Sequence, residues 1–168
     1  MNRVSLGLIS DTHGLIRPEA LEALRGCDLI LHAGDVGTQE VLTALGEIAR
    51  VVAVRGNNDR GAWAKELPQR RTLKLGEVRV HLLHALKDLD IDLEIAQVAL
   101  VVSGHSHRPM IDRRDGVLIV NPGSAGPRRF RLPVSVARCE IVGSRVEASL
   151  VPLAIADRAH IPIRRISR

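Results

Sequence analysis

Residues 3–14 read RVSLGLISDTHG, an apolar run that ends in a cluster of polar side chains. The same arrangement returns twice before residue 56, which gives three short apolar runs at 3–10, 28–34 and 50–56. Runs of this length, bounded by glycine and polar residues, are typical of buried strands. The two segments between them read as amphipathic helices. A βαβαβ order predicts a parallel sheet with right-handed crossovers.

Beyond Pro68 the pattern changes from crossovers to hairpins. Turn signals separate pairs of apolar segments at Gly76-Glu77, Asp115-Gly116 and Gly143-Ser144. Between the first two hairpins, a short helix is predicted over 88–97 and an apolar strand over 98–104. Joining a parallel half to a hairpin-rich half predicts an α/β fold. The expected architecture is a four-layer α-β-β-α sandwich, with two mixed sheets face to face and helices outside.

Length and composition indicate one globular domain, residues 1–168, with 45% hydrophobic and 26% charged residues. The segment 152–168 shows no clear period, so no element is assigned to it. No apolar run approaches the roughly 20 residues that cross a bilayer, and no cleavable signal pattern is visible. A cytoplasmic location without membrane contact is therefore predicted. Cys27 and Cys139 lie far apart and outside any CxxC pair, which favours buried free thiols.

The charge balance is basic, with a net charge of +5 and a pI near 10.2. A basic surface favours anionic partners such as phosphates or nucleic acid, although many arginines can equally form a solvated surface. The chain has one Trp, one Phe and no Tyr. Single-stranded nucleic acid stacks on aromatic faces, so this composition disfavours a general RNA-binding module.

Polar clusters follow five of the predicted apolar strands. They are SDTHG at 10–14, HAGD at 32–35, RGNND at 55–59, LLHA at 82–85 and SGHSH at 103–107. Because ligands of open α/β sheets bind beyond the carboxyl ends of strands, these clusters are expected to converge. Together they offer seven nitrogen and oxygen ligands: Asp11, His13, Asp35, Asn57, His84, His105 and His107. This set lacks a thiolate and suits Mn²⁺, Fe or Zn²⁺, and seven ligands suit two ions that share one carboxylate.

In order and spacing, DTH, GD, GN, a lone histidine after a strand and GHSH resemble the motifs of the calcineurin-like metallophosphoesterases. The resemblance extends from Asp11 to about Arg128, and NPGSAGPR at 121–128 is similar to the small prokaryotic phosphodiesterases. It implies a dinuclear, metal-dependent phosphodiesterase whose substrate is a small phosphodiester or a nucleotide-like molecule. Manganese is the metal expected first, with zinc, iron, nickel and magnesium as alternatives.

The resemblance also implies a role for each ligand. The first ion would bind Asp11, His13 and His107, the second would bind Asn57, His84 and His105, and Asp35 would bridge the two. Two-metal sites hold their ions roughly 3.5–4 Å apart. A bridging hydroxide, acidified by both ions, would attack phosphorus in line while the ions neutralise the developing charge.

Two positions depart from the family pattern. Many members have a histidine after the motif asparagine, thought to protonate the leaving oxygen, whereas this chain has Asn58. An amide has no usable proton to transfer but can hydrogen-bond a phosphate oxygen, so Asp35, Asn57 and Asn58 are the catalytic candidates. The second departure is Ala85, which follows His84 where a glycine is usual.

Several other polar residues are expected to have structural roles. His32 is expected to be hydrogen-bonded in the interior, and His81 is expected to face away from His84. Asp59 is expected to brace its own loop, and Asn121 and Ser124 are expected to brace the GHSH loop. Two other functions use the same fold. A non-catalytic scaffold, like the eukaryotic retromer scaffold subunit, is the main alternative, and a nucleic-acid processing enzyme is another. Exposed edge strands also favour a homo-oligomer, either a dimer or a tetramer.

Overall fold

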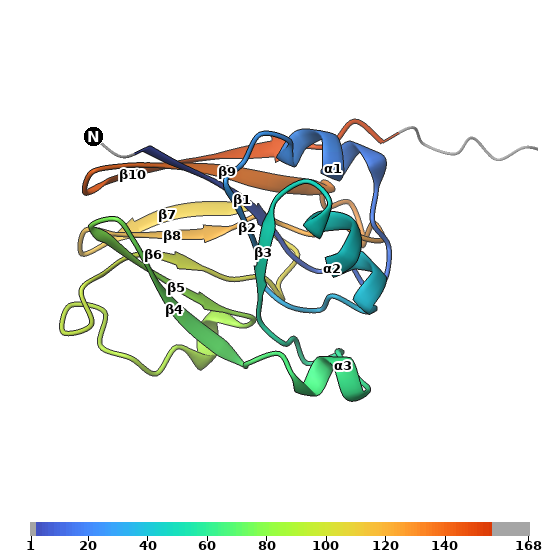
Figure 1. The fold of residues 1–168 in the computed structure, drawn as a ribbon, viewed down its shortest axis with the longest axis horizontal. Helices are drawn as coiled ribbons and strands as arrows, with labels where there is room; N and C mark the ends of the chain where they lie inside the picture. Colours follow the sequence, from blue (N-terminus) through green and yellow to red (C-terminus); the bar gives the residue numbers. More distant parts are fainter. Residues whose placement is uncertain (1–2, 156–168) are drawn as a thin grey trace, which may run out of the picture.

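The computed structural model describes residues 3–155 and contains two five-stranded sheets that lie face to face (Figure 1). The first sheet has the order β10-β9-β1-β2-β3 and the second β4-β5-β6-β8-β7. The strands of the first sheet are β1 Arg3–Ile9, β2 Leu29–His32, β3 Arg50–Ala53, β9 Ser135–Val142 and β10 Arg145–Pro152. Those of the second are β4 Arg70–Leu75, β5 Val78–Leu83, β6 Val98–Val102, β7 Met110–Arg114 and β8 Val117–Asn121.

The predicted parallel half is confirmed. β1 pairs in parallel with β2, and β2 with β3, through the crossover helices α1 (Pro18–Leu24) and α2 (Gln39–Gly46). Both helices turn their apolar face to the outer side of this sheet, where Leu24 and Leu45 are fully buried beside Ile30. The carboxyl ends of these three strands consequently meet at one edge of the sheet.

All three predicted hairpins form: β4 with β5, β7 with β8, and β9 with β10. The Asp115-Gly116 turn has positive φ at both residues, 48° and 82°, as a type I′ turn requires. The second sheet is mixed, because β5, β6 and β8 run in parallel between the two antiparallel edges. This arrangement brings the ends of β5 and β6 to the same side of the molecule as those of the first sheet (Figure 1).

The predicted helix over 88–97 is wrong. That region contains a short 3₁₀ turn, η1 (Leu86–Asp88), followed by irregular chain with one further turn before β6. The Asp92 carboxylate accepts the backbone N–H groups of Glu94 and Ile95, which caps a single turn. Gln97 then takes φ 53°, a left-handed conformation that a continuing helix does not allow.

The main core lies between the two sheets, and the predicted sandwich is confirmed. Leu8, Leu31, Leu82, Leu100 and Val120 are buried there at 0% exposure. Helices cover the outer face of the first sheet, whereas η1 and the following loop cover that of the second through a smaller apolar cluster. Strand β10 continues to Pro152, into the segment left unassigned from sequence, and residues 156–168 lie outside the described range. Within residues 3–155, no helix is long and apolar enough to cross a membrane.

Candidate metal centre

The structure brings all seven candidate ligands to one edge of the sandwich. Asp11 and His13 follow β1, Asp35 follows β2, Asn57 follows β3, His84 follows β5, and His105 and His107 follow β6. Backbone hydrogen bonds join the loops that carry them. The N–H of Asp11 donates to the Gly34 carbonyl at 3.0 Å, and that of His13 donates to the Asp35 carbonyl at 2.9 Å.

Five of the seven candidates have left-handed backbones. The φ angles are 54° at Asp11, 47° at His13, 52° at Asp35, 66° at His105 and 58° at His107. This region is unfavourable for residues other than glycine and persists only where the surrounding structure imposes it. Such strain clusters at sites where side chains must be aimed, and here it turns five side chains toward one another.

The first group consists of Asp11, His13 and His107. The Nε2 atoms of the two histidines lie 3.5 Å apart, and Asp11 Oδ1 lies 3.3 Å from His107 Nε2 and 4.0 Å from His13 Nε2. Asp11 is fully buried, and its Oδ2 accepts hydrogen bonds from Ser10 Oγ and from the N–H of His105. Its Oδ1 is buried without a hydrogen-bond partner. A buried carboxylate oxygen is costly to leave unpaired, so a cation is the fitting partner.

The second group consists of Asn57, His84 and His105. Asn57 Oδ1 lies 2.9 Å from His84 Nε2 and 3.1 Å from His105 Nδ1, and the two ring nitrogens are 3.3 Å apart. His84 Nδ1 lies 2.8 Å from the Ala33 carbonyl and can only donate to it. The neutral ring then presents a lone pair at Nε2, opposite the lone pair of Asn57 Oδ1, and this pair of acceptors fits a shared cation.

Asp35 lies between the two groups. Its Oδ2 is 3.8 Å from His13 Nε2 and 3.5 Å from His84 Nε2. Burial alone would raise the pKa of Asp35, but hydrogen bonds from His84 and from the backbone and side chain of Asn58 outweigh it and hold the pKa far below its usual range. Asp35 is therefore an anion at any physiological pH, as a carboxylate shared by two cations must be.

The net pKa shifts of the two neighbouring histidines are opposite, although the carboxylates act to raise both pKa values. Burial lowers the pKa of His13 despite the nearby charges of Asp35 and Asp11, which keeps its ring available as a neutral ligand. Burial also acts to lower the pKa of His84, but the hydrogen bonds with Asp35 and the Ala33 carbonyl raise it overall. A cation bound at Nε2 would take the place of that proton, since imidazole ligates metals in its neutral form.

Sequence comparison places this donor set in a family. The sequence profile described as "Calcineurin-like phosphoesterase superfamily domain" matches residues 4–144. A probable metallophosphoesterase of Methanocaldococcus jannaschii is 34% identical over 162 residues, covering 88% of this chain and 81% of that protein. The chain belongs to the calcineurin-like phosphoesterase superfamily. A probable metallophosphoesterase of Methanothermobacter thermautotrophicus is 35% identical over 161 residues, covering 87% of this chain and 91% of that protein.

A more distant relative and two solved structures of similar fold differ in the function for which they are named. A phosphodiesterase of M. jannaschii is 22% identical over 139 residues, covering 71% of this chain and 83% of that protein. The crystal structure of a predicted phosphoesterase from Streptococcus pneumoniae aligns with TM-score 0.69 at 24% identity, covering 90% of this chain and 91% of that one. The structure of Vacuolar Protein Sorting 29 from Cryptosporidium parvum aligns with TM-score 0.73 at 19% identity, covering 89% of this chain and 97% of that one. These structural likenesses establish the shared fold.

Asp59 and Asn121 brace the loops that the sequence predicted, whereas Ser124 braces the loop after β1 instead of the GHSH loop. Both carboxylate oxygens of Asp59 accept backbone N–H groups, from Gly37 at 2.8 Å and from Gly56 at 2.7 Å. Asn121 Nδ2 donates to the Gly104 carbonyl at 2.8 Å, and Ser124 Oγ donates to the Asp11 carbonyl at 2.9 Å. These contacts brace the loops that follow β1, β3 and β6.

The structure shows how the chain accommodates the two departures from the superfamily pattern. Ala85, in place of the usual glycine, takes φ −110° and ψ 121°, an ordinary extended conformation that any residue adopts. Asn58 donates to both oxygens of Asp35, from its backbone N–H at 2.8 Å and from Nδ2 at 2.7 Å. Asn58 thus orients the central carboxylate, a contact that the sequence did not predict.

His32 is a structural residue, as expected. It is fully buried, its Nε2 lies 2.9 Å from Thr12 Oγ1, and its Nδ1 accepts the N–H of Gly34 at 3.2 Å. Burial lowers the pKa of His32 to about 4. His81 is buried on the opposite side of β5 from the main core and pairs with Thr72 Oγ1 at 2.8 Å.

This burial predicts acid sensitivity. Between pH 6.5 and about pH 4, His32 is protonated in the unfolded chain but stays neutral in the folded protein. The free energy of unfolding is therefore unaffected by His32 above pH 6.5 and decreases as the pH falls below it. We expect urea unfolding of the wild type to lose about 2 kcal/mol more than His32→Gln does between pH 7 and pH 5, at 1.36 kcal/mol per pKa unit. Equal losses in the two proteins would contradict a neutral, buried His32.

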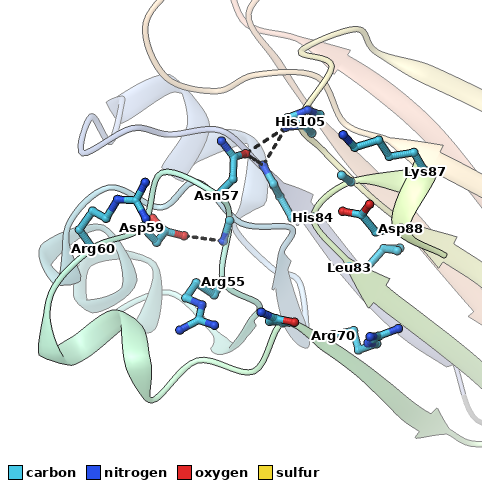
Figure 2. A pocket seen from close by; sticks show the side chains of 13 residues that line it. Arg55, Asn57, Asp59, Arg60, Arg70, Leu83, His84, Lys87, Asp88 and His105 are labelled. Carbon is cyan, nitrogen blue, oxygen red and sulfur yellow. Dashed lines mark hydrogen bonds between the residues drawn. The ribbon is translucent and has the colours of Figure 1, made fainter. Parts of the chain in front are cut away.

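A cavity of about 650 Å³ opens beside the second ligand group (Figure 2). Asn57, His84 and His105 form one part of its wall. Its other charged residues are Arg55, Asp59, Arg60, Arg70, Lys87 and Asp88. Arg55 and Asp59 belong to the RGNND cluster at 55–59, but the sequence did not predict that any of the six lines a cavity.

Proposed function

We propose that this protein is a phosphodiesterase with a dinuclear metal centre, manganese first among the candidate ions. One observation carries the proposal. Two groups of three ligands face each other across Asp35, whose Oδ2 lies within 4 Å of a histidine in each group, and a buried oxygen of Asp11 has no hydrogen-bond partner among residues 3–155. Nitrogen and oxygen donors in this number suit two ions of the Mn²⁺, Fe or Zn²⁺ type.

In this proposal the first ion is held by Asp11, His13 and His107, the second by Asn57, His84 and His105, and both by Asp35. When bound, the ions would supply a hydroxide nucleophile at neutral pH and neutralise charge on the phosphoryl oxygens. The chain itself orients the ligands. Ala33 fixes the tautomer of His84 through its carbonyl, and Asn58 holds both oxygens of Asp35.

A metal analysis joined to a diester assay tests this function. We expect two divalent ions per chain after saturation with Mn²⁺ and dialysis, and Mn²⁺-dependent hydrolysis of bis(p-nitrophenyl) phosphate that a chelator abolishes and added Mn²⁺ restores. Fewer than two ions per chain would contradict the dinuclear centre. Two bound ions without any turnover would contradict the enzyme.

The residue at position 58 predicts which substrates react well. Asn58 cannot protonate a leaving oxygen, and general acid catalysis contributes typically about 10²–10⁴-fold. We therefore expect efficient hydrolysis of aryl diesters and weak hydrolysis of alkyl phosphomonoesters. Asn58→His should narrow the gap between good and poor leaving groups. The check is the slope of log kcat/KM against leaving-group pKa in both proteins, and a wild-type preference for alkyl monoesters would contradict this role.

The alternative is a non-catalytic scaffold on the same fold, which the likeness to Vacuolar Protein Sorting 29 keeps open. The complete set of seven ligand-type residues and the phosphodiesterase among the relatives favour the enzyme. Turnover with bound metal separates the two functions. The cytoplasmic location and the homo-oligomer expected from sequence stay predictions.

A further inference from the structure

The cavity beside the second ligand group has a charge pattern that the metal centre does not use. Beyond Asn57, His84 and His105 it is lined by four cationic side chains and two carboxylates: Arg55, Arg60, Arg70, Lys87, Asp59 and Asp88. The surplus of positive charge lies in a recess that continues from the ligands (Figure 2). A concave surface of one sign concentrates ligands of the opposite sign.

The contacts of these side chains decide which charges are available. Arg70 forms an ion pair with Asp90, and both carboxylate oxygens of Asp59 are taken by the N–H groups of Gly37 and Gly56. Within residues 3–155, the side chains of Arg55, Arg60 and Lys87 have no hydrogen-bond or ion-pair partner. Three cations thus face the cavity against the single carboxylate of Asp88.

These cations lie in the same cavity as the second ligand group. Figure 2 shows the Lys87 side chain reaching toward His105, with Arg55 away from Lys87, below Asn57. None of the three cations is among the seven candidate ligands. The lining contains no phenylalanine, tyrosine or tryptophan, so the aromatic rings that a nucleobase would meet there are the imidazoles of the candidate ligands His84 and His105.

We propose that the cavity binds a second anionic group of the substrate, a phosphate or a carboxylate on one ester arm, through Arg55, Arg60 and Lys87. This proposal rests on the proposed function and specifies its substrate class: a phosphodiester that carries a further anion on one arm, in preference to a diester whose two arms are uncharged. Arginine and lysine at such a position give charge-assisted hydrogen bonds to an oxyanion. The cavity sets the selectivity, whereas the seven ligands set the chemistry.

Binding of non-hydrolysable phosphonates tests the proposal without turnover. Protein loaded with two equivalents of Mn²⁺ is titrated calorimetrically with α,ω-alkane bisphosphonates of two, four and six methylenes, beside alkyl monophosphonates of equal length. We expect the best bisphosphonate to bind about tenfold more tightly than its partner, the order expected for hydrogen bonds to a charged group. The preference should fall as salt is raised.

Matched variants locate the effect. Arg55→Gln/Lys87→Gln should bring the ratio of the two affinities close to one, and the exposed Arg60→Gln should lower it partly. Arg145→Gln removes the same charge from the β9–β10 hairpin, which lies near the amino end of β1, opposite the metal centre, and should keep the ratio. Thermal unfolding verifies that each variant is folded.

Each outcome decides a different part of the proposal. A ratio near one for every spacer, in protein that hydrolyses bis(p-nitrophenyl) phosphate, overturns the anion subsite and leaves the phosphodiesterase standing. A ratio that survives in the double variant assigns the preference to other residues and also overturns the subsite. Tight bisphosphonate binding without hydrolysis of any diester overturns the substrate assignment together with the proposed function.

Discussion

Replacing Asp35 with asparagine is expected to reduce kcat/KM for bis(p-nitrophenyl) phosphate by at least about 10³-fold. Loss of residues that merely support metal ligands costs typically about 10–100-fold, and a ligand shared by two ions should cost more. Asparagine has nearly the shape of aspartate, but it removes the charge that lies between His13 and His84. It also places an amide donor against the two N–H donors of Asn58.

The matched control is His32→Ala, on the same strand-and-loop segment. His32 touches Thr12 and Gly34 rather than the ligand atoms, so its loss should cost about 10–100-fold in kcat/KM. Metal content supplies a second measurement: Asp35→Asn should retain fewer than two ions per chain, and His32→Ala should retain both. Equal losses of activity in folded proteins, or two tightly held ions in Asp35→Asn, would mean that Asp35 does not bridge the centre.

The sequence predicted where the ligands converge because that information is local. Asp11, Asp35 and Asn57 each follow an apolar run, and parallel strands must end at one edge of their sheet. The hairpins were equally accessible, since Asp115-Gly116 specifies its turn through two adjacent residues. Both predictions depended on patterns shorter than ten residues.

The features that the sequence did not reveal depend on tertiary contacts. The left-handed backbones of Asp11 and His105 come from loops that hold each other in place. Neither aspartate nor histidine by itself indicates a left-handed backbone in a sequence. In the failed helix over 88–97, the apolar residues recur at every second position, a period that argues against an amphipathic helix and that the prediction did not weigh. The cations of the cavity, Arg55 and Lys87, come from segments far apart in the sequence, and no pattern indicates that they share a cavity.

Two backbone segments of the candidate centre pack closely at Gly56, directly before Asn57. A Cβ added at Gly56 would lie 2.1 Å from the backbone nitrogen of Asp35 and 2.2 Å from its Oδ1. Atoms this close must separate, and the obstacle is backbone rather than the end of a flexible side chain. The loops after β2 and β3 therefore approach each other at a distance that glycine alone permits.

We accordingly expect Gly56→Ala to lower the free energy of unfolding by about 3 kcal/mol or more, at the upper end of the usual cost of overpacking against fixed structure. Gly46→Ala is the matched control, because a Cβ there meets nothing within 4 Å at the end of α2. That change should be neutral or stabilising by up to about 1 kcal/mol. Urea unfolding in chelator separates packing from metal binding. A loss below about 1 kcal/mol in Gly56→Ala would show that the two loops can move apart freely, and Asp35 would then lack the rigid support that a carboxylate between two ions requires.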